Sequence, residues 1–111
     1  NAKELKEAAE YYGKAADVNN DGKLYLKQAR LLTLREQHKA AIPVLKKALA
    51  AGGVSEGEVE FELALAYLGT KQYKAAYNAC LKAAKDEKTK RTANSYLAYI
   101  KEKARIYNVA L

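Results

Sequence analysis

The chain has 111 residues and a net charge of +7, which suits one small domain with a single core. Hydrophobic residues make up 50% of it, beside six Gly and one Pro, so we expect an all-α fold. No apolar run approaches the roughly 20 residues that span a bilayer, which predicts a soluble chain. The absence of Met indicates a mature product or an excised fragment, and we read residues 1–2 as a tag remnant.

The basic charge by itself excludes few partners, because acidic residues are interspersed with the basic ones. Basic residues are densest at Lys82, Lys85, Lys88, Lys90 and Arg91. This stretch could attract a polyanion such as nucleic acid. No aromatic-plus-basic motif accompanies it, so solvated helix faces are the better interpretation than nucleic-acid binding.

The first predicted helix covers residues 3–16, where apolar residues recur at helical spacing. Six residues rich in turn formers, 17–22, then predict a loop. Asp17, Asn19, Asp21 and Gly22 match the first half of a calcium-binding loop. Gln28 stands where such a loop needs a bidentate acid, so we interpret the loop as an Asx-type turn that caps the next helix.

Four further helices follow by the same reasoning. A helix over 23–36 and another over about 39–51 are predicted, the latter stopped by Gly52 and Gly53. Ser55 followed by Glu58 predicts a capping box that starts a helix near Glu56. Residues 59–85 then read as helix, tight turn and helix, with the break at 69–72.

The last predicted helix runs from Thr89 or Thr92 to Tyr107. Apolar residues form one stripe along it and basic residues the opposite face. It therefore resembles an end cap, with one face buried and one in water.

Small or apolar residues recur at offsets of 33 and 35 residues, as Ala8, Tyr12 and Ala15, then Ala41, Leu45 and Ala48, then Ala76, Cys80 and Ala83. This helix–turn–helix period resembles the tetratricopeptide repeat (TPR) family, whose repeat is about 34 residues. The resemblance implies a right-handed α-solenoid of about six antiparallel helices in the order B, A–B, A–B, A. Residues 3–21 would be the second helix of a truncated repeat, 22–54 and 55–88 two repeats, and 89–111 a C-terminal capping helix. A start in mid-repeat implies excision from a longer array.

Three phrases narrow this resemblance, at residues 21–26, 47–53 and 93–99. They are similar to the last repeats of a bacterial group of TPR proteins. Some members of that group are periplasmic components of TonB-type energy-transduction systems. The resemblance therefore implies a bacterial protein, located in the periplasm.

No set of residues suggests catalysis. His38 and Cys80 are the only His and the only Cys, and they stand 42 positions apart, so they cannot build a zinc site. We read His38 as a turn-packing residue and Cys80 as a buried small hydrophobe. A glycine-rich phosphate loop is also missing. We therefore expect no enzyme, no metal and no cofactor.

In TPR proteins the first helices of successive repeats line a concave groove for a peptide or helix of a protein partner. The matching positions here are Lys23, Leu26, Arg30, Thr33, Leu34, Phe61, Leu65, Leu68, Ser95 and Tyr99. Their aliphatic and aromatic side chains would suit an apolar ligand, and Lys23 and Arg30 would suit an acidic group.

Three alternatives stay open. Phe61, Leu65 and Leu68 could pack against the last helix or the next repeat and leave no groove. The basic stretch could bind a polyanion. The segment could also be purely structural, extending a solenoid or associating with itself.

Overall fold

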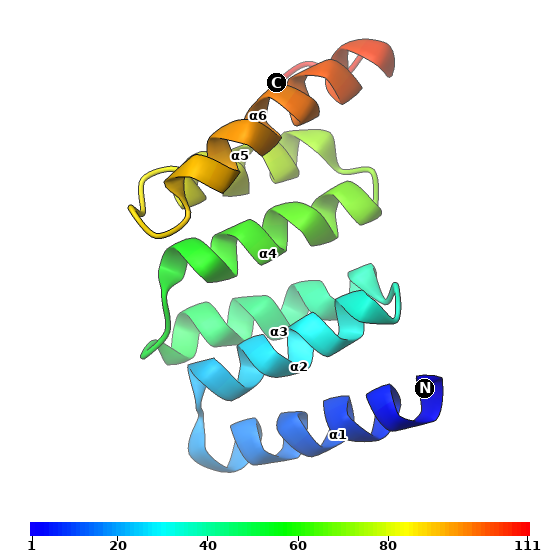
Figure 1. Cartoon of the computed structure of the whole chain (residues 1–111), viewed down its shortest axis with the longest axis vertical. Helices are drawn as coiled ribbons and strands as arrows, with labels where there is room; N and C mark the ends of the chain where they lie inside the picture. Colours follow the sequence, from blue (N-terminus) through cyan, green and yellow to red (C-terminus); the bar gives the residue numbers. More distant parts are fainter.

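Six helices joined by short connections make up the whole chain, and no strand is present in the computed structural model, which describes residues 1–111. The helices are α1 (Ala2–Asn19), α2 (Gly22–Leu34), α3 (His38–Ala51), α4 (Glu56–Gly69), α5 (Tyr73–Ala83) and α6 (Lys90–Ile106). Each runs antiparallel to its neighbours, and they stack along the long axis of a molecule of 41 × 29 × 19 Å (Figure 1). The predicted all-α fold is confirmed. None of the six helices has the length and apolar character needed to cross a membrane.

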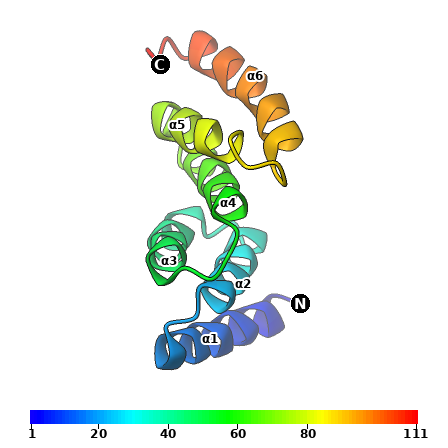
Figure 2. The ribbon, with the colours of Figure 1, turned by 90° about the vertical axis from the view of Figure 1, so that its left-hand side faces the viewer.

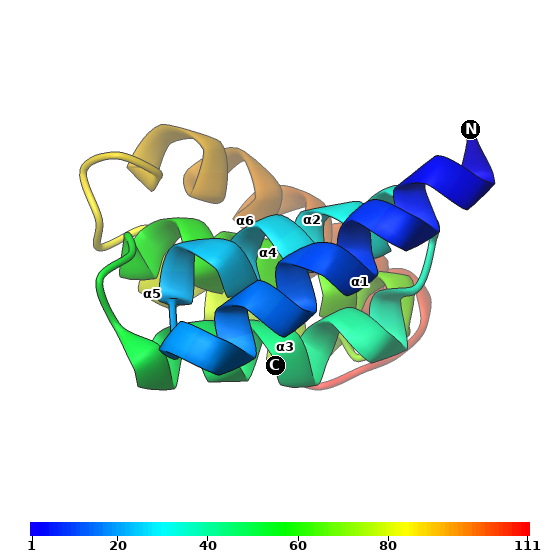
Figure 3. The same ribbon diagram turned by 90° about the horizontal axis from the view of Figure 1, so that it is seen from below.

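Every helix packs chiefly against its neighbours in sequence, but α2 also contacts α4, and α4 contacts α6. These three helices therefore lie side by side and form what we call the α2–α4–α6 face. Helices α3 and α5 lie behind them in Figure 1 and on the side away from α2 and α6 in Figure 2. Figure 3 views the stack from the end that α1 closes. The α2–α4–α6 face thus brings together segments that are far apart in the sequence.

Small residues allow the helices to approach closely. The buried stripes of α3 and α5 consist of the predicted residues, Ala41, Leu45 and Ala48 on α3 and Ala76, Cys80 and Ala83 on α5. They pack with Val59 and Leu63 of α4 in one continuous core. Because close-packed interiors leave few voids, alanine at these positions sets the spacing of the helices.

On α1 the buried stripe consists of Ala9, Gly13 and Ala16, one residue later than the predicted Ala8, Tyr12 and Ala15, which are half-buried. The reason is a close approach at Gly13. The side-chain amide of Gln28 on α2 fills the space that a Cβ of residue 13 would occupy. The long side chain of Gln28 is therefore accommodated by a glycine across the α1–α2 interface.

The first helix is also longer than predicted, because Asp17 and Asn19 belong to α1. The hydroxyl of Tyr25 donates a hydrogen bond of 2.7 Å to Asp17, which ties this last turn to α2. Only residues 20 and 21 remain as a turn, so the alternating ligands of a calcium loop are not formed. Asp21 accepts hydrogen bonds from the N–H groups of residues 23 and 24, at 2.9 and 3.3 Å, which confirms the predicted Asx cap.

The start of α4 follows the prediction in part. Ser55 Oγ accepts a hydrogen bond from the Glu58 N–H at 3.3 Å, so α4 begins at Glu56 as expected. The reciprocal half of the capping box is absent, because the Glu58 carboxylate pairs with Lys88 Nζ at 3.0 Å. Asp86 accepts from Ser55 Oγ and from the Gly57 N–H, each at 3.1 Å. These bonds hold the α5–α6 connection, and with it Lys88, against α4.

The other helix ends lie within two residues of the predicted ones. Helix α2 ends at Leu34 rather than residue 36, because Glu36 adopts a left-handed φ of 59° that no helix continues. Helix α6 begins at Lys90, between the two predicted starts.

Candidate functional site

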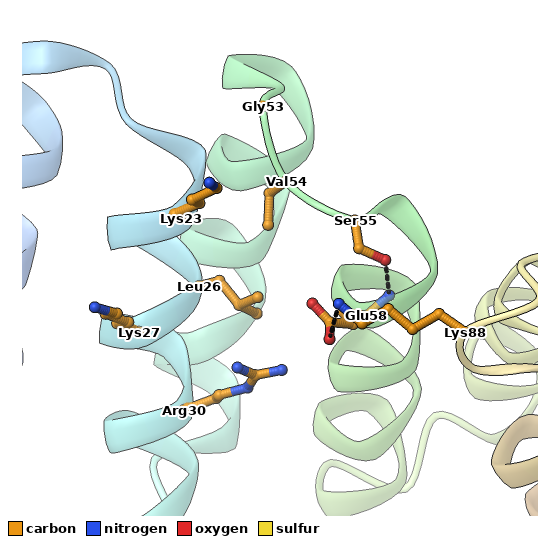
Figure 4. A pocket seen from close by; sticks show the side chains of 9 residues that line it. All are labelled: Lys23, Leu26, Lys27, Arg30, Gly53, Val54, Ser55, Glu58 and Lys88. Atoms are coloured by element: carbon orange, nitrogen blue, oxygen red, sulfur yellow. Dashed lines mark hydrogen bonds and ion pairs between the residues drawn. The ribbon is translucent and has the colours of Figure 1, made fainter.

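Two hollows open on the α2–α4–α6 face, and each encloses about 590 Å³. The basic hollow is lined by Lys23, Leu26, Lys27, Arg30, Gly53, Val54, Ser55, Glu58 and Lys88 (Figure 4). The tyrosine hollow is lined by Thr33, His38, Leu65, Leu68, Gly69, Ser95, Tyr96 and Tyr99. One helical turn separates Arg30 from Thr33 on α2, so the hollows follow one another along the helices. The basic hollow lies at the amino ends of α2 and α4 and the tyrosine hollow at their carboxyl ends.

The structure divides the ten predicted groove residues between these hollows. Lys23, Leu26 and Arg30 line the basic hollow, Thr33, Leu65, Leu68, Ser95 and Tyr99 line the tyrosine hollow, and Leu34 and Phe61 line neither. Two successive hollows on one face therefore carry eight of the ten. Sequence register thus grouped residues that lie together, but it merged two chemically different hollows into one groove.

Three apolar residues that were predicted to line an open groove have other surroundings in the structure. Leu26 is buried in the core and forms the floor of the basic hollow. The ring of Phe61 packs edge-to-face on Tyr96 with 5.1 Å between centroids, so Phe61 supports α6. Leu34 is exposed at the end of α2, outside both hollows. The alternative in which Phe61, Leu65 and Leu68 pack against the last helix therefore describes Phe61, whereas Leu65 and Leu68 line an open hollow.

Aromatic rings form the α6 wall of the tyrosine hollow. Tyr96 and Tyr99 meet edge-to-face at 6.2 Å, and Tyr99 is 50% exposed. Lys103 Nζ lies 5.5 Å from the centroid of the Tyr99 ring. Opposite this wall stand half-buried leucines of α4. The surface is therefore apolar with hydroxyl groups at its edge, the chemistry that suits an aliphatic or aromatic side chain.

His38 closes the tyrosine hollow from the start of α3. Its ring packs on Gly69 so closely that a Cβ at residue 69 would lie within 3.0 Å of the imidazole. The Nδ1 atom is buried and has no hydrogen-bond partner. His38 thus packs against the following helix from the turn, as its register predicted.

Cations outnumber carboxylates in the basic hollow. Arg30 Nε lies 3.3 Å from Glu62 Oε1, and Lys88 Nζ lies 3.0 Å from Glu58 Oε1. Lys23 makes no ion pair. Lys27 turns toward α1 in Figure 4, where its Nζ lies 5.6 Å from the ring centroid of Tyr12. The excess positive charge favours an acidic group at this hollow.

Sequence reasoning missed several lining residues, for identifiable reasons. Tyr96 stands three positions before Tyr99, and that helical spacing could have revealed it. Lys88 comes from a connection whose position depends on the hydrogen bonds of Asp86, which no sequence pattern indicates. Glu58 was assigned to a capping box alone.

Carboxylates neutralise part of the basic stretch at residues 82–91. Lys82 Nζ lies 3.7 Å from a carboxylate oxygen of Glu60. Lys82 and Lys85 line a small hollow together with three acids, Glu56, Glu60 and Asp86. These carboxylates lower the local potential that a polyanion would meet.

Cys80 is a buried small residue, as predicted. Its Sγ donates to the Ala93 carbonyl at 3.1 Å, and burial raises the pKa of the thiol to about 11. No three His, Cys, Asp or Glu side chains are grouped so that they could hold a metal ion.

Comparison with known proteins gives no match, whether to a family model, to a curated protein or to a solved structure. The TPR resemblance therefore rests on the residues of this chain alone. The function has to be argued from the two hollows.

Proposed function

We propose that the chain is a non-enzymatic protein-interaction module of the TPR type, which binds a peptide or helical segment of a partner on the α2–α4–α6 face. The observation that carries this proposal is the succession of a basic and an apolar, tyrosine-walled hollow along one face. An amphipathic segment can place an apolar side chain against Tyr99 while its acidic group meets Lys23 and Arg30. Buried aromatic contacts then supply most of the affinity, and the charges set the orientation.

Two glycines support the proposed division of the chain into TPR-like repeats. Gly22 and Gly57 stand 35 residues apart, each in the first turn of its helix. A Cβ at Gly22 would lie within 3.0 Å of the Gly52 carbonyl, and one at Gly57 would come equally close to Asp86. Similar close approaches at positions one repeat length apart support a stack of similar repeats.

The chemistry of the only Cys and the only His supports the non-enzymatic part. A thiol whose pKa is raised to about 11 by burial is not a nucleophile at neutral pH. The Nδ1 atom of His38 is buried without a hydrogen-bond partner, so this nitrogen is not paired with a nucleophile or an acid.

The proposal is tested with Tyr99→Ser and, as a matched control, Tyr11→Ser, since Tyr11 is a 69% exposed tyrosine on α1, away from both hollows. The probe is a labelled synthetic peptide with two acidic residues at one end and Leu and Phe at the other, followed by fluorescence anisotropy. Loss of a central aromatic contact should weaken binding about tenfold, whereas Tyr11→Ser should leave it unchanged. Equal effects of the two substitutions would contradict the proposal.

A location in the bacterial periplasm and a role in a TonB-type system remain predictions from the resemblance. Fractionation of cells that produce the protein naturally would test the first. Detection of the protein in the cytoplasm alone would rule it out.

A further inference from the structure

The geometry points to Glu58 and Glu62 as internal competitors, which hold the cations of the basic hollow and thereby limit its affinity for the acidic group of a partner. This inference rests on the proposed function. It specifies the occupant as an acidic and apolar peptide segment, and it makes these two carboxylates determinants of specificity.

The two acidic side chains are less exposed than the cations with which they pair. Glu58 and Glu62 stand one turn apart on α4, and their side chains are 26% and 15% exposed. The paired Lys88 and Arg30 side chains are 64% and 47% exposed. An incoming carboxylate can therefore reach either cation from solvent without moving α4.

Arg30 has hydrogen-bond donors that Glu62 does not use. It donates to Glu62 through Nε, which leaves its two terminal nitrogens for a second carboxylate. The charge of Glu62 nevertheless lowers the attraction that this second carboxylate feels. Lys23, which has no ion pair, supplies the first attraction for an approaching acid.

Charge complementarity favours a peptide over nucleic acid as the occupant. A phosphodiester strand would carry one charge per nucleotide past both Glu58 and Glu62. It would then cross the tyrosine hollow, whose lining residues include Leu65 and Leu68 but no Lys or Arg. A peptide needs an acid at one end only and can present apolar side chains at the other.

The test compares Glu62→Gln and Glu58→Gln with Glu102→Gln, which removes the same charge from an exposed ion pair with Arg105 within α6. Binding of the acidic and apolar peptide is measured beside that of a version with Gln in place of its acids. Each substitution at the hollow should tighten binding of the acidic peptide about twofold to fivefold, the range expected when an exposed ion pair is removed. Neither should change binding of the Gln version, and Glu102→Gln should change neither peptide. Lys23→Gln should weaken binding of the acidic peptide. Circular dichroism confirms that each variant is folded.

Unchanged or weaker binding in both Glu58→Gln and Glu62→Gln would overturn the inference. If Tyr99→Ser still weakened binding of the same peptide, the proposed function would stand even though the inference about Glu58 and Glu62 had failed. Failure of every peptide to bind the unmodified chain would overturn both. Tighter binding of single-stranded DNA than of the acidic peptide, insensitive to Tyr99→Ser, would show a polyanion site instead.

Discussion

Replacing Gly57 with Ala should destabilise the fold, although Ala in a helix is normally favoured over Gly by about 0.5–1 kcal/mol. A Cβ at residue 57 would lie within 3.0 Å of Asp86 Cβ and Thr89 Oγ1. Carbon atoms in contact prefer about 3.5–4.0 Å. Asp86 cannot simply withdraw, because it accepts hydrogen bonds from the Gly57 N–H and from Ser55.

The expected size follows from two opposing effects. Forcing an extra methyl group into a packed site costs about 1–3 kcal/mol. The gain in helix propensity offsets about 0.5–1 kcal/mol of this cost. Gly57→Ala should therefore lower the free energy of unfolding by about 1 kcal/mol, within a range of about 0–2.5 kcal/mol.

Gly13→Ala provides the matched control, because Gly13 is also a buried helical glycine with a close neighbour. That neighbour is the amide end of Gln28, which can rotate away. Gly13→Ala should therefore leave stability unchanged or raise it by up to about 1 kcal/mol. Urea unfolding followed by far-ultraviolet circular dichroism measures both variants. A Gly57→Ala variant at least as stable as the original chain would refute the packing argument.

Three further predictions concern titrating groups. Burial raises the pKa of the Glu60 carboxyl more than Lys82 lowers it. The ionised carboxylate therefore destabilises the fold at pH values above the raised pKa, and the protonated carboxyl does not destabilise it in strong acid. Glu60→Gln should therefore raise the urea midpoint at neutral pH, and an equal gain at pH values below the ordinary glutamate pKa would contradict this. The pKa of Asp86 is lowered by hydrogen bonds, the largest effect coming from the Lys88 N–H and smaller ones from Ser55 Oγ and a backbone N–H of α4. Ionised Asp86 therefore stabilises the fold above the ordinary aspartate pKa, and this stabilisation is lost as pH falls through the lowered pKa. Asp86→Ala should accordingly lower the melting temperature at neutral pH and less so in acid, and a constant difference would argue against the linkage. With its pKa raised to about 11, Cys80 should react with a thiol reagent at neutral pH only in urea; rapid labelling of the native chain would show that the thiol is accessible.

Local patterns predicted the elements of this fold well. Asp21 and Ser55 start α2 and α4 through short-range hydrogen bonds that the sequence reveals. The end of α1 could not be predicted in this way, because Asp17 is held in the helix by Tyr25, a partner on the next element. Propensity assigns Asp17 and Asn19 to a turn, and a tertiary contact overrides it.

The candidate site was harder to predict than the helices. Register correctly indicated Leu65 and Tyr99 as neighbours on one face, because the helical period fixes which side chains point the same way. It could not separate exposed from buried positions, so Leu26 was expected at the surface although it lies in the core. It also could not find Lys88, whose place depends on how the connection folds back on α4.

Amide chemical-shift mapping by NMR, on the isotope-labelled chain with the acidic and apolar peptide, shows directly which face binds the peptide. We expect the largest shifts on the α2–α4–α6 face, around Thr33, Leu65 and Tyr99 at one hollow and Lys23 and Arg30 at the other. Shifts confined to α1 or to the outer surfaces of α3 and α5 would contradict it. The absence of any shift at high peptide concentration would contradict it as well.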